Sequence, residues 1–366
     1  MTVFGTRPET IKMAPLVKEL KSRPEIETIV CVTAQHRQML DQVLNAFQIV
    51  PEYDLDIMKQ DQTLSDITRR VLKGLEKVMQ KEKPDIVLVH GDTTTTFSGA
   101  LAAFYQQIPI GHVEAGLRTY NKYSPFPEEI NRQFVGTVAD LNFAPTEKSK
   151  ENLLAEGKLE KSIVVTGNTA IDALQTTVQE SYTHEVLDWV GEDKMIMLTA
   201  HRRENWGEPM RNIFSAIKRI VDKYEDVKVV YPMHLNPIVV DTAKEIFGSC
   251  EKVRLIEPLE VLDFHNMLNR SYLILTDSGG IQEEAPSLGK PVVVLRDTTE
   301  RPEGIEAGTL KLAGTDENTI YSIIDELLSN KVVYEKMSKA SNPYGDGLAS
   351  KRIVDEIIKY FKAKGE

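Results

Sequence analysis

The chain of 366 residues exceeds what one hydrophobic core usually organises, so its length predicts two domains of similar size. Hydrophobic residues make up 41% and charged residues 27% of the sequence, a composition typical of globular proteins that excludes a disordered chain. The net charge of −11 argues against non-specific binding to nucleic acid, so any anionic ligand must meet local arginines, lysines and helix N-termini.

The first half of the chain alternates strand patterns with helix patterns. Strands are predicted at residues 3–4, 28–33, 85–90 and 109–116, and helices at 11–20, 62–80 and 96–106. This alternation predicts a parallel sheet, whose ligands gather outside the carboxyl ends of the strands. Arg7, Asp92 and Glu114 each follow a strand end, and Lys12 lies on the helix after Arg7, which favours a phosphate site there.

Residues 123–132 begin a further helix, with Pro127 at a suitable first position and Glu128 and Glu129 in the first turn. Two interpretations are open for these glutamates: surface groups that complement the helix dipole, or carboxylates of a site. Short strands at 142–145 and 163–168 complete the first domain, which we place at residues 1–167.

The second half repeats the pattern. A strand at 195–200 runs into the polar turn 201–205 and a helix at 208–223, and further strands are predicted at 228–234 and 253–256. The segment 342–347 is rich in Pro and Gly, which suits a linker. We therefore place the second domain at residues 168–348 and expect the C-terminal helix, within 349–366, to return to the first domain.

The stretch from Leu273 to Leu295 predicts a strand, a tight turn at residues 277–280, a helix that ends at Gly289, and a second strand. Glycines at the start of such a helix let the backbone approach a ligand, and its unpaired N–H groups favour a diphosphate. Glu283 and Glu284 are then placed to accept ribose hydroxyls. The alternative is that Gly280 caps the helix and Glu283 is its capping-box partner.

Several fingerprints are absent from the sequence. It contains no G-x-G-x-x-G after a strand, no P-loop and no G-x-S-x-G elbow, so nicotinamide, ATP and serine hydrolase sites are not supported. His90 with Asp92, or His112 with Glu114, lacks the further ligands of a metal site, so we predict no metal and no cofactor. Two cysteines, no signal peptide and no apolar run of membrane length predict a cytoplasmic protein without membrane partners.

A series of short motifs runs along the whole chain. They are Gly5-Thr6-Arg7-Pro8-Glu9, His90-Gly91-Asp92-Thr93, His112-Val-Glu-Ala-Gly-Leu-Arg118, Pro127-Glu128-Glu129-Ile-Asn131-Arg132, His201-Arg202-Arg203-Glu204-Asn205, Asp277-Ser278-Gly279-Gly280-Ile-Gln-Glu283-Glu284 and Arg301-Pro302-Glu303. This series resembles the non-hydrolysing UDP-N-acetylglucosamine 2-epimerases. The resemblance implies an α/β fold of two Rossmann-like domains with a cleft between them, the glycosyltransferase-B architecture. It also implies a homodimer that reversibly converts UDP-N-acetylglucosamine to UDP-N-acetylmannosamine for cell-surface polysaccharide synthesis.

The resemblance also implies roles for individual residues. The positions similar to those that hold UDP and the substrate are Arg7, Lys12, His201, Ser278, Gly279, Gly280 and Glu283, with Glu283 on the ribose. The positions similar to the catalytic set are Asp92, Glu114, Glu128 and His201. In relatives of the Gram-positive type a second substrate molecule acts as an activator, and its contacts match Gln35, Gln38, Glu128, Arg202 and His234. Asp61 stands where the family has a basic residue, a departure that bears on this effector site.

The chemistry follows from the substrate. The C2 hydrogen is not next to a carbonyl, so its direct abstraction would leave an unstabilised carbanion. Loss of UDP from C1 first gives an oxocarbenium-like centre, from which a carboxylate can take the C2 proton to form a glycal. Re-addition of UDP with protonation on the other face inverts C2, and Arg7, His201 and the helix start at Gly279 stabilise the departing diphosphate.

Three other functions remain open from the sequence. They are a glycosyltransferase on the same architecture, a hydrolysing epimerase that releases the free sugar, and a nucleotide-sugar sensor. Incubation with UDP-N-acetylglucosamine alone separates them, because only the non-hydrolysing epimerase gives the intact epimeric nucleotide sugar.

Overall fold

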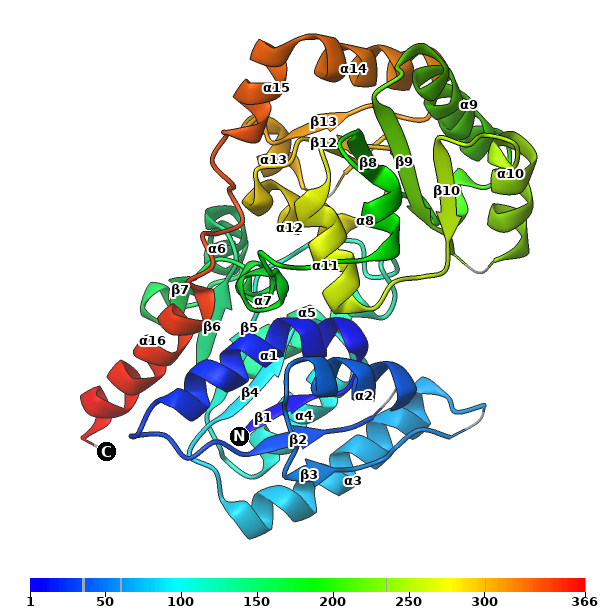
Figure 1. The fold of residues 1–366 in the computed structure, drawn as a ribbon. Helices are drawn as coiled ribbons and strands as arrows, with labels where there is room; N and C mark the ends of the chain where they lie inside the picture. The colour runs from blue at the N-terminus through cyan, green and yellow to red at the C-terminus, as the bar shows by residue number, and fades with distance from the viewer. Residues whose placement is uncertain (35–36, 60, 235, 300, 366) are drawn as a thin grey trace. The chain divides into compact units, whose positions relative to one another are not determined.

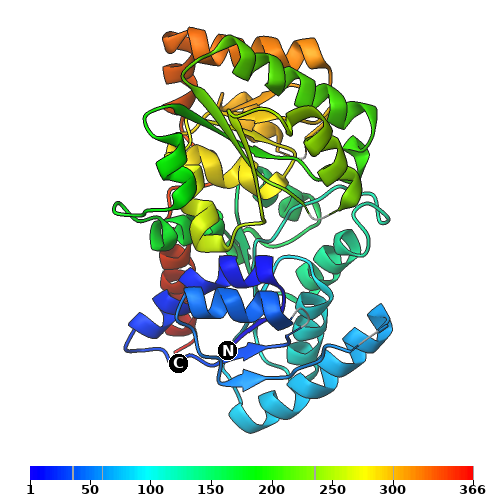
Figure 2. The same ribbon diagram turned by 45° about the vertical axis from the view of Figure 1, so that its right-hand side comes forward.

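The computed structural model describes residues 1–34, 37–59, 61–234, 236–299 and 301–365 (Figure 1). The chain forms two compact units, Met1–Thr176 with Tyr344–Glu366, and Thr177–Pro343. Each unit contains a parallel sheet with helices packed on its faces (Figures 1 and 2). The prediction of an α/β fold with two Rossmann-like sheets is therefore confirmed.

In the described part of the first unit, the sheet has the strand order β3-β2-β1-β4-β5-β6-β7, with parallel neighbours throughout. Its strands are β1 (Thr2–Phe4), β2 (Val30–Val32), β3 (Tyr53–Asp54), β4 (Val87–His90), β5 (Ile110–Val113), β6 (Leu141–Ala144) and β7 (Ile163–Val165). The residues of β4 and β5 are all buried, because helices cover both faces of the sheet. The site residues predicted after β1, β4 and β5 thus follow three neighbouring strands.

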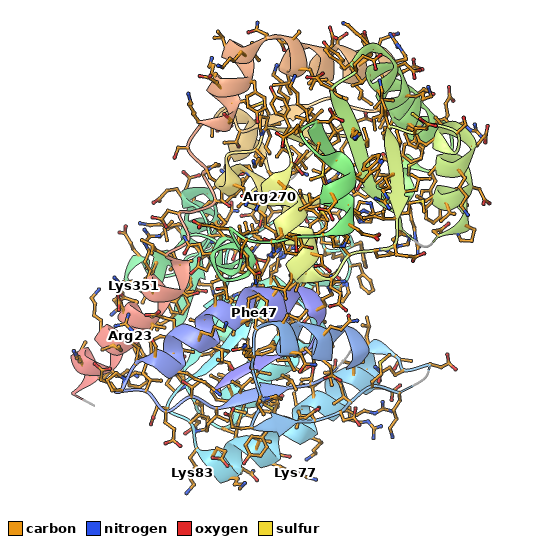
Figure 3. The ribbon with its side chains drawn as sticks, in the orientation of Figure 1. Arg23, Phe47, Lys77, Lys83, Arg270 and Lys351 are labelled. Carbon is orange, nitrogen blue, oxygen red and sulfur yellow. The ribbon has the colours of Figure 1, made fainter. Side chains whose placement is uncertain are left out.

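The helices of the first unit are α1 (Arg7–Ser22), α2 (Arg37–Ala46), α3 (Leu64–Glu82), α4 (Thr94–Tyr105), α5 (Glu128–Val138), α6 (Glu147–Ala155), the short η1 (Glu160–Ser162), α7 (Thr169–Thr177) and α16 (Ala349–Lys364). Helix α1 begins at Arg7, earlier than predicted, because Thr6 and Glu9 form a capping box and Pro8 suits the first turn. Helix α16 lies beside α1, and Arg23, labelled in Figure 3, donates to Asp355 of α16 at 2.7 Å.

In the second unit, the described strands have the order β10-β9-β8-β11-β12-β13, again with parallel neighbours. They are β8 (Lys194–Thr199), β9 (Val227–Pro232), β10 (Val253–Ile256), β11 (Leu273–Thr276), β12 (Val292–Val294) and β13 (Leu310–Leu312). The helices are α8 (Glu185–Val190), η2 (Arg203–Asn205), α9 (Glu208–Lys223), α10 (Pro237–Phe247), α11 (Val261–Arg270), α12 (Gly279–Glu284), η3 (Ala285–Leu288), α13 (Pro302–Glu306), α14 (Glu317–Ser329) and α15 (Lys331–Ser338).

The core of the second unit lies between its sheet and α9. Ile213, Ile217 and Ile220 recur at helical spacing on α9 and are fully buried. Phe214 packs against Tyr231 of β9 with ring centroids 5.6 Å apart. Strands β8 and β11 are the two central strands of the sheet, and the polar turns that follow them carry the predicted nucleotide-binding residues.

Candidate active site

Glu114 lies directly after β5 and is the centre of a cluster of polar side chains in the first unit. It pairs with Lys12, accepts a hydrogen bond from Nδ2 of Asn168 at 3.0 Å, and lies 3.7 Å from Nε2 of His90. Its backbone adopts a φ of +63°, in the left-handed region that residues with side chains rarely occupy. Such strain is concentrated at functional sites, where surrounding contacts hold it in place.

Two histidines of adjacent strands are buried beside this cluster. Burial lowers the pKa of His90 from 6.5 to about 4, with Glu114 opposing the effect. Burial likewise lowers the pKa of His112 from 6.5 to about 4, and its Nε2 lies 2.7 Å from the carbonyl oxygen of Gly91. Both imidazoles are therefore neutral near pH 7.

Asp92, two residues after β4, is held by helix α5. Nε of Arg132 donates to its Oδ2 at 2.8 Å, and Nη2 lies 2.6 Å from the same oxygen. Nδ2 of Asn131 donates to the backbone carbonyl of Asp92 at 2.8 Å. The predicted carboxylate is thus fixed at both its side chain and its backbone.

The two glutamates at the start of α5 have different environments. Glu128 is half-buried, whereas Glu129 is fully buried and accepts hydrogen bonds from the N–H groups of Thr119 and Tyr120, both at 3.0 Å. Burial acts to raise the pKa of Glu129, but these hydrogen bonds and the charge of Arg132 outweigh it and lower the pKa. The interpretation of Glu129 as a surface group is therefore wrong, because its carboxylate anchors the preceding loop.

Arg7 is the first residue of α1, and Glu9 of the same turn connects the loops after β1 and β4. Glu9 is buried, and its carboxylate accepts from the N–H groups of Gly5 and Thr6 at 3.0 and 2.7 Å. It also accepts from the hydroxyl of Thr93 at 2.7 Å. Burial raises the pKa of Glu9, against these hydrogen bonds. The carboxylate therefore fixes the loop that carries Arg7 against the loop that carries Asp92.

In the second unit, His201 follows β8 and Asp277 follows the adjacent strand β11. Nδ1 of His201 lies 3.2 Å from Oδ1 of Asp277, whose side chain is fully buried. Oδ2 of Asp277 accepts from the N–H groups of His201 and Arg202 at 2.8 and 2.9 Å. Burial acts to raise the pKa of Asp277, but His201 and these N–H groups outweigh it and lower the pKa.

The turn after Asp277 starts helix α12, with Ser278 as its N-cap and Gly279 and Gly280 as its first residues. A Cβ at Gly279 would lie 3.0 Å from the guanidinium of Arg301, so a side chain there would push this arginine away by a few tenths of an ångström. Nε and Nη2 of Arg301 each lie 2.8 Å from Oε1 of Glu283. The capping-box alternative is wrong, because Ser278 is the cap and the Glu283 carboxylate bonds Arg301 instead.

The predicted effector residues lie in both units. In the second, the rings of His201 and His234 stack with centroids 5.9 Å apart, and Arg202 shares the Asp277 carboxylate through its backbone. In the first, Gln35 is outside the described residues, and Gln38 is on α2 with its side chain outside the description. Asp61 is exposed with a φ of +55°.

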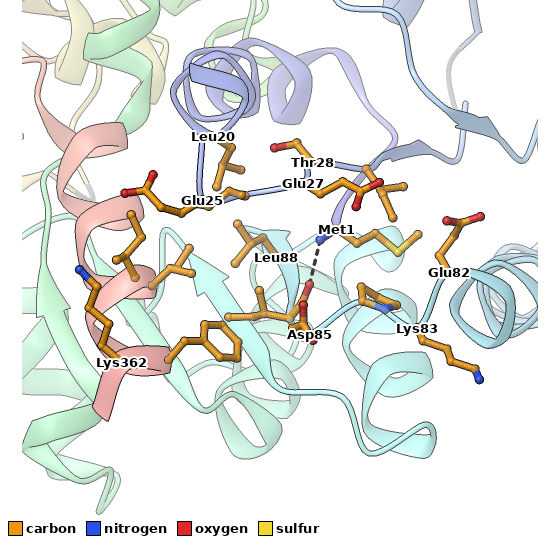
Figure 4. A pocket seen from close by; sticks show the side chains of 17 residues that line it. Met1, Leu20, Glu25, Glu27, Thr28, Glu82, Lys83, Asp85, Leu88 and Lys362 are labelled. Atoms are coloured by element: carbon orange, nitrogen blue, oxygen red, sulfur yellow. Dashed lines mark hydrogen bonds between the residues drawn. The ribbon is translucent and has the colours of Figure 1, made fainter. Parts of the chain in front are cut away.

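A cavity of about 480 Å³ lies in the first unit at the amino-terminal end of β1 (Figure 4). Its lining combines apolar side chains, such as Met1 and Leu20, with charged ones, such as Glu25, Asp85 and Lys362. Its lining contains none of the predicted site residues, which follow the carboxyl ends of the strands. The cavity is therefore separate from the candidate active site.

Among the described residues there is neither a candidate membrane span nor a candidate metal site. No helix there combines the length and apolar character needed to cross a bilayer. Among the same residues, no three His, Cys, Asp or Glu side chains are grouped as a metal ion would require.

Several residues organise the site although no catalytic or binding role is predicted for them from the sequence, namely Asn131, Arg132, Asn168, Asp277 and Arg301. Four of them belong to motifs that the sequence displays, and Asn168 is the last residue of the strand predicted at 163–168. The sequence therefore indicates that these residues lie near the site, but it does not indicate which groups they bond.

The chain is similar in sequence and in structure to known proteins of one family. The sequence profile described as UDP-N-acetylglucosamine 2-epimerase matches residues 18–358. A UDP-N-acetylglucosamine 2-epimerase of Bacillus subtilis is 68% identical over 366 residues, which cover 100% of this chain and 96% of the relative. A UDP-GlcNAc 2-epimerase from Neisseria meningitidis, solved bound to UDP-GlcNAc, is 51% identical with a TM-score of 0.87 over 98% of this chain and 99% of that one. An S. aureus protein solved as a co-structure with UDP is 59% identical with a TM-score of 0.90 over 99% and 96% of the two chains.

The fold and these similarities place the chain among the α/β isomerases built on two Rossmann-like sheets. It belongs to the UDP-N-acetylglucosamine 2-epimerase family.

Proposed function

We propose that this protein reversibly converts UDP-N-acetylglucosamine to UDP-N-acetylmannosamine by eliminating and re-adding UDP through a 2-acetamidoglucal intermediate. The observation that carries the proposal is the cluster around Glu114. A carboxylate at a strand end, held in a left-handed backbone and paired with Lys12, is arranged to exchange a proton with a bound substrate. The family match and the relative solved with UDP-GlcNAc support the choice of substrate.

The groups of the first unit are assigned to the sugar. Asp92, Glu114 and Glu128 supply the base that removes the C2 proton and the acid that returns a proton on the opposite face. Lys12 and Arg132 bear positive charge against Glu114 and Asp92, and the buried, neutral His90 adds no further charge. We therefore assign proton exchange at C2 to the three carboxylates, two of which are balanced in charge by Lys12 and Arg132.

The groups of the second unit, with Arg7, are assigned to UDP. When the C1–O bond breaks, the electron pair stays on the β-phosphate, which gains negative charge. We assign the stabilisation of that charge to the N–H groups of Gly279 and Gly280 at the start of α12 and to the His201 ring. The hydroxyl of Ser278, the N-cap, is assigned to the same diphosphate, because its N–H already donates to the hydroxyl of Thr276. Asp277 holds His201 for this purpose, and Glu283 is assigned to the ribose.

The proposal extends to the setting of the reaction. We assign a homodimer in the cytoplasm whose product serves cell-surface polysaccharide synthesis, with a second substrate molecule as activator. The reaction needs no redox cofactor, because loss of UDP and its return leave the oxidation state of the sugar unchanged. We assign the stabilisation of the departing diphosphate to Arg7, His201 and the start of α12 in place of a metal ion.

The test is incubation of the protein with UDP-N-acetylglucosamine alone, followed by proton NMR. We expect UDP-N-acetylmannosamine to accumulate to a constant ratio that is also reached from the product side. Release of free N-acetylmannosamine would instead indicate a hydrolase, and unchanged substrate would indicate a transferase or a sensor.

A further inference from the structure

We infer that Arg132 and Glu129 are positioning residues that hold Asp92 in the orientation its proton transfer needs. The inference rests on the proposed function, because it assigns Asp92 to chemistry at the sugar. Neither residue is assigned a contact with substrate. Both belong to the motif at residues 127–132, in which Arg132 has so far been given only its charge against Asp92 and Glu129 no part in the reaction.

The geometry uses both edges of the guanidinium. On one edge, Nε and Nη2 of Arg132 meet Oδ2 of Asp92 at 2.8 and 2.6 Å. On the other, Nη1 donates to Oε2 of Glu129 at 3.3 Å, and Glu129 lies three residues earlier on the same helix. Because a planar guanidinium held at both edges cannot rotate, the Asp92 carboxylate meets a rigid donor.

Glu129 connects this pair to the loop before α5. Its side chain is fully buried, and it accepts from the N–H groups of Thr119 and Tyr120 as well as from Arg132. A buried carboxylate is costly unless its oxygens are satisfied, so the loop, Glu129 and Arg132 stabilise one another. Glu128 is the first residue of the same helix, so the network also fixes the backbone position from which the Glu128 side chain extends.

The backbone of Asp92 is fixed independently. Nδ2 of Asn131 donates to its carbonyl oxygen at 2.8 Å. Helix α5 thus holds Asp92 through two successive residues. Asn131 bonds the main chain of Asp92, and Arg132 bonds its side chain. This double restraint acts on a partly buried carboxylate, and proton transfer depends on sub-ångström placement of such a group.

The experiment is a double-mutant cycle on the full-length protein with UDP-N-acetylglucosamine as substrate. It compares Arg132→Met, Asp92→Asn and the combined variant, with Arg132→Lys as the conservative change. The matched control is Arg23→Met, because Arg23 also bridges two carboxylates of the first unit, Glu19 and Asp355, away from the site.

We expect Arg132→Met to lower kcat roughly 10²-fold, as small displacements of a reacting group do, while the Kd for UDP changes less than about 3-fold. Arg132→Lys should recover only part of this loss, because an ammonium cannot bond both carboxylates in a plane. The combined variant should be no slower than Asp92→Asn alone, because Arg132 acts through Asp92. Arg23→Met should keep the kcat of the unmodified protein.

Two results would overturn the inference: an unchanged kcat in Arg132→Met, or losses that multiply in the combined variant. If Arg132→Met fails to fold, Arg132→Lys replaces it in the cycle under the same criteria. An unmodified protein that does not convert the substrate would overturn the proposed function, and the inference with it. Failure of the inference alone leaves the unmodified protein active, so the two failures are distinguishable.

Discussion

Oδ1 of Asp277 lies 3.2 Å from Nδ1 of the His201 ring, and Oδ2 of the same carboxylate accepts a hydrogen bond from the backbone N–H of His201 at 2.8 Å. One buried side chain therefore fixes both the ring and the backbone of the histidine that we assign to UDP. The pair arises because β8 and β11 are parallel neighbours whose carboxyl ends meet. Asp277 belongs to a motif of the sequence, but only the sheet order places it against His201.

Asp277→Asn should impair both stability and turnover. An amide nitrogen in place of Oδ2 would face two N–H donors, so buried groups lose their acceptor at a cost of roughly 1–3 kcal/mol. We expect kcat to fall roughly 10²-fold, because the histidine loses its orientation. Thermal unfolding and steady-state kinetics measure these effects, with Asp226→Asn, which removes an exposed pair with Lys194, as the control. Equal behaviour of the two variants would contradict the assignment.

The buried histidines predict a pH dependence of stability. Their folded pKa values, about 4, lie below the ordinary 6.5, so the unfolded chain binds protons that the folded chain does not. Their contribution to the free energy of unfolding is complete above pH 6.5 and is lost as the pH falls toward 4. At pH 5 the two histidines together should bind roughly two protons from solution when the chain unfolds. Urea unfolding measures the slope, which His112→Asn should reduce by about one proton; an unchanged slope would show that His112 titrates normally.

Glu283 and Glu284 make a matched pair for testing the ribose contact. Glu283→Gln should weaken UDP binding about 10-fold, because the substitution removes a charge that also holds Arg301 beside Gly279. Glu284→Gln changes the half-buried neighbour and should weaken binding less. Isothermal titration with UDP gives both constants. The reverse order would move the ribose assignment to Glu284.

The effector proposal makes a kinetic prediction. His234→Ala and Gln35→Ala should weaken activation by UDP-N-acetylglucosamine more than they weaken UDP binding, because these residues are assigned to the second substrate molecule. The stacking of His234 on His201 provides a physical route from that molecule to the site. Initial rates against substrate concentration should be sigmoidal in the unmodified protein and flatter in the variants. Hyperbolic rates in all three proteins would remove the effector site.

The sequence predicted elements well where local patterns determine them. Helix α9 was predicted at 208–223 and is observed at Glu208–Lys223, because its apolar stripe and the flanking turn are both local signals. The start of α1 was missed, although Thr6 and Glu9 display the capping signature. Contacts between segments that are distant in the sequence could not be predicted from such local patterns. The bond from Arg132 to Asp92 spans 40 positions in the sequence, and neither it nor the left-handed backbone of Glu114 leaves a periodic pattern.

The elimination mechanism is tested most directly by the fate of the C2 hydrogen. The protein is incubated with UDP-N-acetylglucosamine in heavy water, and the product is examined by proton NMR and mass spectrometry. A carboxylate removes the C2 proton, and the acid that returns a proton to C2 has exchanged its own proton with the solvent. UDP-N-acetylmannosamine should therefore carry deuterium at C2. Glu114→Gln and Asp92→Asn should form this labelled product roughly 10²–10⁴-fold more slowly. Product that retains its original C2 hydrogen, formed at full rate in both variants, would contradict the mechanism.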